Sequence, residues 1–211
     1  AIGPSTGAVI VEPLQGEGGI HTAEPGFLRA LRQACDEQGA LLIFDEVQCG
    51  LGRTGRLWAY EASGVTPDLM TLAKPLGGGL PIGATLITGR VAEAIEPGDH
   101  GSTFAANPVI CEVARVVLRR LSDPDFLAGV RQRGAYVRQR LLRLKDRHPV
   151  VREVRGQGLI WGLELATEAA PLIARGYERG LIVTSAGDTV LRLVPPLVVS
   201  EEHIDEALAI V

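Results

Sequence analysis

The run from Ala40 to Gly50, ALLIFDEVQCG, constrains the fold more than any other stretch. Its five apolar residues, Ala40 to Phe44, form a run short enough to be a buried strand. The run ends abruptly in two carboxylates, Asp45 and Glu46. Ligands of open parallel sheets bind at the carboxyl ends of the strands, so an acid there is either a cap for the next turn or part of a site. Taken alone, Asp45 is more often a cap.

Strands and helices alternate along the first part of the chain. Apolar runs that end in Glu12 and in Lys74 predict two further buried strands, and helical spacing of apolar residues predicts a helix between the first two strands. In chain order we expect a strand over 7–13, a helix over 24–37, the strand at 40–44, a short helix over 57–63, and strands over 68–73 and 82–88. This alternation indicates an α/β fold whose mostly parallel sheet is covered on both faces.

The composition changes after Asn107. Long arginine-rich helices are predicted over 109–121 and 124–147, followed by a mixture of strands and shorter helices. We therefore expect a large sheet domain over residues 1–107, a connecting helix over 108–123, and a small C-terminal α+β domain over 124–211. The start at Ala1 has no initiator methionine and no signal-like segment, which suggests a cut in a longer protein.

Charge and cysteine content exclude several classes of partner. The net charge is −4, which gives no electrostatic reason to bind nucleic acid or an anionic membrane, and no apolar run is long enough to span a bilayer. The three cysteines lack CxxC spacing and the histidines lack metal-ligand spacing, so we expect neither a disulfide framework nor a metal site. A cytoplasmic protein fits this cysteine usage.

Lysine is the scarcest informative residue. Only Lys74 and Lys145 occur, against nineteen arginines, and Lys145 lies in a charged helical run that predicts a solvated face. Lys74 follows an apolar strand and precedes Pro75 and three glycines, where we expect its ammonium to be partly desolvated. An amine that must become a nucleophile needs such a place, and arginine cannot replace it because it does not deprotonate. A structural lysine paired with a carboxylate is the equally weighted alternative.

Other motifs give weaker signals. The run 156–162, GQGLIWG, misses a dinucleotide fingerprint because strand-like residues follow where a helix should open. Gly77 to Gly79 are not followed by the lysine and hydroxyl of a phosphate loop, and no GxSxG motif suggests a serine hydrolase. The arginines between 115 and 155 alternate with leucine and valine at helical spacing, which favours a solvated helix face over a patch for an anionic partner.

Several long motifs, in order and spacing, resemble the class III pyridoxal-phosphate aminotransferases, and most closely the acetylornithine/ornithine aminotransferase branch. These motifs are VEPLQGEGG, LLIFDEVQCGLGRTG, TLAKPLGGGLPIGA, HGSTFAANP and LRLVPPL. The resemblance implies fold type I, in which residues 1–107 are the C-terminal portion of the large pyridoxal-phosphate-binding domain. It also implies a homodimer that shares two active sites.

The resemblance assigns roles residue by residue. Lys74 matches the lysine that forms a Schiff base with pyridoxal 5'-phosphate and then shuttles a proton, and Asp45 matches the acid that keeps the pyridine nitrogen protonated. Gln48 matches the residue that hydrogen-bonds the ring hydroxyl, and Val47 matches the apolar residue packed under the ring. Ser102 and Thr103 match residues that reach the phosphate of the neighbouring subunit's cofactor. Arg192 matches the residue that binds the substrate α-carboxylate, and Glu17 matches a gating acid that pairs with Arg192 when an ω-amine substrate is bound.

These matches predict ping-pong transamination between an ω-amino acid such as N-acetylornithine and 2-oxoglutarate. Ornithine, succinylornithine or 4-aminobutyrate transamination, an aminomutase, a racemase, or a truncated chain that is inactive alone remain open. The sequence departs from the family at Ala105 and Ala106, where two glycines are usual, and at Pro75. The family's N-terminal part, with its phosphate loop and ring-stacking aromatic, has no counterpart here, so we expect only part of a complete site.

Overall fold

The first sheet has four strands in the order β1-β2-β3-β4 in a computed structural model, which describes residues 2–211; Ala1, the first residue of the expected large domain, lies outside them. The strands are β1 (Ala8–Val11), β2 (Leu41–Asp45), β3 (Leu69–Leu72) and β4 (Ala84–Ile87). β1, β2 and β3 are parallel, and β4 is antiparallel to β3. The mostly parallel sheet predicted from the sequence is therefore confirmed.

Helix α1 (Pro25–Gln38) packs against the centre of this sheet. Pro25 begins the helix, and Gly39 ends it with a φ of 71°, in the left-handed region that glycine adopts without strain. Leu28 of α1 is buried in one cluster with Leu42 of β2. The outer strands are not buried on both faces, contrary to expectation: Ile10 on β1 is 62% exposed, because no described element packs over it on that face of the sheet.

The second sheet is antiparallel, in the order β5-β6-β8-β7. Its strands are β5 (Val151–Gln157), β6 (Ile160–Leu165), β7 (Thr184–Ala186) and β8 (Val190–Leu193), and the accompanying helices are α5 (Ala170–Glu178) and α6 (Glu201–Ile210). An antiparallel sheet with helices agrees with the α+β organisation predicted for this part of the chain. The domain boundaries themselves stay a prediction.

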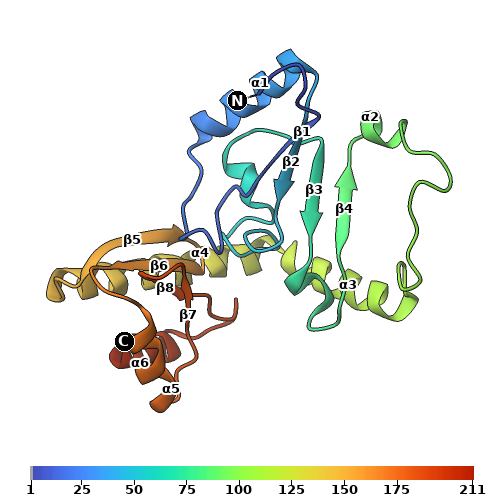
Figure 1. The fold of residues 1–211 in the computed structure, drawn as a ribbon. Helices are drawn as coiled ribbons and strands as arrows, with labels where there is room; N and C mark the ends of the chain where they lie inside the picture. Colours follow the sequence, from blue (N-terminus) through green and yellow to red (C-terminus); the bar gives the residue numbers. More distant parts are fainter. Residues whose placement is uncertain (1) are drawn as a thin grey trace.

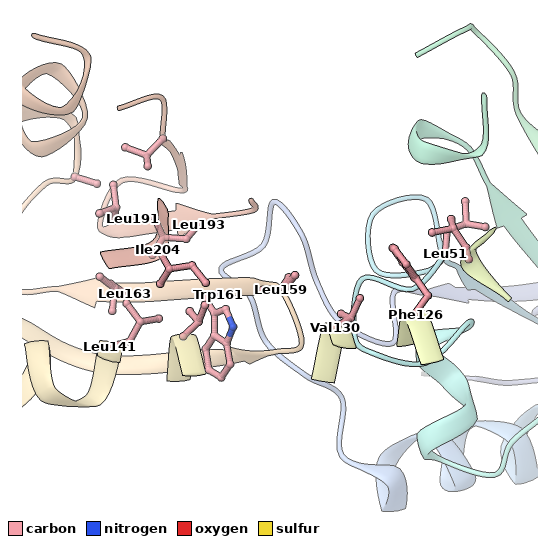
Figure 2. Close-up of a cluster of buried hydrophobic side chains, with 14 of the residues drawn as sticks. Leu51, Phe126, Val130, Leu141, Leu159, Trp161, Leu163, Leu191, Leu193 and Ile204 are labelled. Carbon is pink, nitrogen blue, oxygen red and sulfur yellow. The ribbon is translucent and has the colours of Figure 1, made fainter. Parts of the chain in front are cut away.

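Two helices connect the sheets, α3 (Pro108–Leu121) and α4 (Pro124–Arg147) (Figure 1). The side chains of Asn107 and Asp123 cap their first turns by accepting backbone N–H bonds. Figure 2 shows that α4 contributes Phe126 and Val130 to a buried cluster that extends from Leu51, after β2, into the second sheet. The core is therefore continuous between the two halves of the chain.

Three short helices complete the described fold. The helix expected over 57–63 is a 3-10 helix, η1 (Ala59–Ala62). The 3-10 helix η2 (Lys74–Gly77) and the single-turn α2 (Gly89–Ala92) were not expected. Among residues 2–211, no helix combines the length and the apolar character needed to cross a bilayer. The same residues contain no group of three or more His, Cys, Asp or Glu side chains that could hold a metal ion.

Candidate functional site

The carboxyl ends of β2 and β3 place Asp45 and Lys74 at the same edge of the first sheet. Asp45 lies opposite Thr71 in the parallel register, and Lys74 follows three residues later. Oδ1 of Asp45 accepts hydrogen bonds from the Val47 backbone N–H (2.9 Å) and the Thr71 hydroxyl (3.1 Å). These two bonds fix the orientation of a half-buried carboxylate that forms no ion pair within residues 2–211.

Lys74 is exposed, so the expected partial desolvation of its ammonium is wrong for the described chain. The reason is its position at the surface-facing start of η2, where the chain leaves the sheet. Lys74 forms no ion pair with any of residues 2–211, so a structural lysine paired with a carboxylate is not seen either. Its backbone has a φ of 41°, an unusual conformation for a residue with a side chain, and such strain concentrates at functional sites.

Glu17, Gln48 and Arg192 meet in one hydrogen-bonded cluster. Oε1 of Glu17 accepts from Nη1 of Arg192 (2.5 Å) and from Nε2 of Gln48 (3.0 Å), and Oε1 of Gln48 accepts from the same Arg192 nitrogen at 3.2 Å. The hydrogen bond from Arg192, followed by that from Gln48, lowers the pKa of Glu17 below its usual range, and the charge of Lys74 adds a smaller effect. Glu17 is therefore a carboxylate at neutral pH, and it lies near enough to the Lys74 ammonium to be stabilised by its positive charge.

The sequence reasoning missed the residues that hold this cluster in place. Nε of Arg192 donates to the Thr184 hydroxyl on the neighbouring strand β7 (3.1 Å). Glu12 accepts the Gly16 backbone N–H at 2.9 Å. A Cβ on Gly16 would lie 2.4 Å from the end of the Gln48 side chain, so a larger residue there would displace Gln48 from its bonds to Glu17 and Arg192. The glycines of this segment indicated a close approach by another group, but only the fold shows that the group is the Gln48 side chain.

Glu46 is a further residue whose role the sequence did not reveal. Its side chain has no exposed surface, and its two carboxylate oxygens accept the backbone N–H groups of Ala59 and Tyr60, each at 2.8 Å. Burial raises the pKa of Glu46 to about 7, although these hydrogen bonds oppose the rise. Glu46 therefore ties the loop after β2 to η1, directly beside Asp45.

The structure does not bring Ser102 and Thr103 to the other site residues. Both are exposed, in the segment between α2 and α3 (Figure 1). In the same segment Ala106 has a φ of 55°, so one of the two alanines at usually glycine positions lies in the left-handed region. The candidate site within residues 2–211 thus comprises the other six predicted residues, Glu17, Asp45, Val47, Gln48, Lys74 and Arg192.

The family model for aminotransferase class III matches residues 1–211. The chain belongs to the class III aminotransferases. Among curated relatives, it is 54% identical over 204 residues to the mitochondrial acetylornithine aminotransferase of Alnus glutinosa, a match that covers 96% of this chain and 45% of the relative. It is 49% identical over 204 residues to the acetylornithine aminotransferase of Caldanaerobacter subterraneus, covering 96% of this chain and 52% of the relative.

Solved aminotransferases share the fold. The N-acetylornithine aminotransferase of Stenotrophomonas maltophilia has a TM-score of 0.89 at 40% identity, with 98% of this chain and 55% of that chain covered. The ornithine aminotransferase of Toxoplasma gondii has a TM-score of 0.91 at 37% identity, with 98% and 50% covered. The predicted class III membership and fold type I are confirmed. The chain spans about half the length of the relatives that it matches.

Pyridoxal phosphate is the cofactor of class III aminotransferases, and the residues of this site fit its ring. Asp45 uses one carboxylate oxygen for the Val47 and Thr71 bonds and has no cationic partner among residues 2–211. A half-buried carboxylate of this kind is stabilised by a cation, and a protonated pyridine nitrogen is one. Lys74, the amine at the same sheet edge, is available for a covalent bond to the cofactor.

Proposed function

We propose that the protein is a pyridoxal-phosphate-dependent aminotransferase that transfers an amino group between an ω-amino acid such as N-acetylornithine and 2-oxoglutarate. The observation that carries this proposal is the cluster of Glu17, Gln48 and Arg192 beside the strand tips that hold Asp45 and Lys74. An arginine whose guanidinium is already paired with an acid can serve two substrates of different shape, because the acid can leave.

The residues of this chain would divide the work as follows. Pyridoxal phosphate, when bound, supplies an electron-accepting ring that stabilises a carbanion. Asp45 would hold the ring nitrogen protonated, since its orientation is set by Val47 and Thr71. Lys74 would bind the cofactor covalently and, once released by substrate, move the proton from the amino-bearing carbon. Gln48 would donate to the ring hydroxyl from its place beside Glu17.

Glu17 and Arg192 would select between the two donors. The planar guanidinium of Arg192 is suited to bind an α-carboxylate with two parallel hydrogen bonds. While Glu17 occupies Arg192, that carboxylate site is closed, which suits a substrate that presents its ω-amine. Departure of Glu17 would open the site to glutamate. A homodimer is part of the proposal, because Ser102 and Thr103 are exposed away from this cluster and could reach a second subunit.

Reductive trapping tests the role of Lys74. Borohydride treatment of the holoprotein, expressed from its complete coding sequence, should attach the cofactor to Lys74, as read by peptide mass. Lys74→Arg should abolish both the trapped adduct and amino transfer. Lys145→Arg is the matched control, because Lys145 is exposed on α4 and is the one other lysine. Trapping on Lys145, or no adduct at all, would contradict the proposal.

The donor is tested by half-reactions. N-acetylornithine and glutamate should each convert the cofactor to its aminated form, and 2-oxoglutarate should reverse the conversion. An aminomutase or racemase needs no external amino acceptor, so a product formed without 2-oxoglutarate would favour one of these enzymes instead.

A further inference from the structure

The gating acid lies on a hairpin, the Glu17 arm, which comprises residues 12–23. Backbone bonds close it: Gln15 N–H donates to the His21 carbonyl and Ala23 N–H to the Pro13 carbonyl, both at 2.9 Å. Glu17 is near its tip, and its side chain is 65% exposed. In Figure 1 the arm is the blue segment that descends from β1 toward the second sheet before the chain returns to α1. The first sheet alone does not hold the arm.

Four residues of the second sheet, one from each strand, form a row across the sheet in which each lies directly opposite the next. Arg155 on β5 pairs with Gly162 on β6, Gly162 pairs with Arg192 on β8, and Arg192 pairs with Thr184 on β7. Directly opposed residues in neighbouring strands point to the same face of a sheet. Arg155 and Arg192 therefore lie on one face, on either side of a residue that has no side chain.

The Glu17 arm occupies the space above Gly162, between Arg155 and Arg192. Ile20 has no exposed surface, and a Cβ on Gly162 would lie 3.0 Å from its Cγ1. Ile20 is thus packed directly over Gly162, between the two arginines. Its φ of 60° is strained for a β-branched residue, so the surrounding contacts must hold it there.

Arg155 grips the arm from the side opposite Arg192. Its Nε donates to the Gly19 carbonyl at 3.0 Å, two residues from Glu17. Its two terminal nitrogens pair with Glu153 and Glu164, each at 2.7 Å, and Glu164 accepts the Thr189 hydroxyl at 2.7 Å. The Arg155 side chain is only 12% exposed, so the guanidinium is held in one orientation toward the arm.

We propose that Arg155 is a positioning residue for the Glu17 gate: by holding the Gly19 carbonyl, it sets how often Glu17 occupies Arg192 and hence which donor the site prefers. This inference rests on the proposed function. Glu17 is exposed, so its bond to Arg192 competes with water and depends on the arm being in place. Loss of the grip frees Arg192 for an α-carboxylate, which favours glutamate over N-acetylornithine.

The test compares kcat/KM for N-acetylornithine and for glutamate in single and double variants. Arg155→Met should shift the ratio toward glutamate by about tenfold, equal to about 1.4 kcal/mol. Arg155→Lys keeps a positive charge near Glu164 but cannot bond Gly19, Glu153 and Glu164 at once, as the three guanidinium nitrogens do. This variant should fold and should shift the ratio in the same direction. In a Glu17→Ala background Arg155→Met should no longer change the ratio, because the gate is already gone.

Arg140→Met is the matched control, because it removes another partly buried arginine, one that pairs with Asp205 and so joins α4 to α6. It should leave the ratio unchanged. An unchanged ratio in both Arg155 variants, or an equal shift with and without Glu17, would overturn the inference and leave Arg155 a purely structural residue.

Hydrogen exchange supplies a readout that does not depend on catalysis. In the cofactor-free protein, amides of residues 14–22 should exchange faster in Arg155→Met than in the wild type or in Arg140→Met. Unchanged exchange would show that Arg155 does not hold the arm. If the wild type transfers no amino group, the proposed function fails, whereas this measurement still decides whether Arg155 grips the arm.

Discussion

The buried carboxylate of Glu46 should make the stability of the loop after β2 depend on pH. Its side chain has no exposed surface, and no cation from residues 2–211 pairs with it. Its donors are the Ala59 and Tyr60 N–H groups and the Cys49 thiol, whose Sγ lies 3.8 Å from Oε2. Burial raises its pKa from 4.5 to about 7. The folded protein thus binds a proton here more tightly than the opened loop does.

The direction of the effect follows from this raised pKa. Stability contributed by a protonated Glu46 is present at low pH and is lost as the pH rises from about 4.5 through 7. A shift from 4.5 to about 7 corresponds to about 3.4 kcal/mol at most. Between pH 5 and pH 8, about 2.5 kcal/mol of it should disappear. Glu46→Gln removes the titration and with it this loss.

Amide exchange of a peptide that carries Ala59 and Tyr60 measures the effect. Comparing wild type with Glu46→Gln at each pH cancels the intrinsic pH dependence of exchange. At pH 5 Glu46 is protonated, and its hydroxyl oxygen can still accept a hydrogen bond, whereas the NH2 group of glutamine cannot. The variant should therefore be the less protected protein at pH 5, and its deficit should shrink or reverse by pH 8, where the wild type has lost the stability of the protonated form. Glu37→Gln, an exposed carboxylate on α1, controls for the change in net charge. A deficit that is the same at pH 5 and pH 8 would refute the reasoning.

Three further variants test a buried ion pair, close packing and backbone strain, each read by urea unfolding of the cofactor-free protein. Asp68→Asn should cost about 3 kcal/mol, because Asp68 accepts the Leu42 N–H and pairs with the largely buried Arg32 at 2.8 Å; a loss below about 1 kcal/mol would contradict this. Gly134→Ala should cost about 2 kcal/mol or more, because its methyl would lie within the contact distance of the Gly158 carbonyl, and a neutral result would show that α4 can move aside. Ala106→Gly should stabilise by about 1 kcal/mol by relieving a φ of 55°, and destabilisation would mean that the strain is not real.

Local pattern was enough to predict most elements. Apolar runs that end in charge located β2 and β3, and helical spacing located α1, α3 and α4 to within a few residues. The failures were of two kinds. β1 was expected to be buried but is partly exposed, as Ile10 shows, and Lys74 was expected to be partly desolvated but is exposed. Both errors concern neighbours in space, which a single stretch of sequence does not reveal.

The sequence alone determined the family, the strand tip that carries Asp45, and the choice of Lys74 over Lys145 as the candidate amine. A residue type at the end of a short apolar run is a local property, so it can be read from the chain. Only the tertiary structure decided that Arg155 and Arg192 flank Gly162, and that Ile20 fills the gap between them. Glu17 and Arg192 are 175 residues apart in the chain, and they meet because strand register and the packing of one hairpin bring them together.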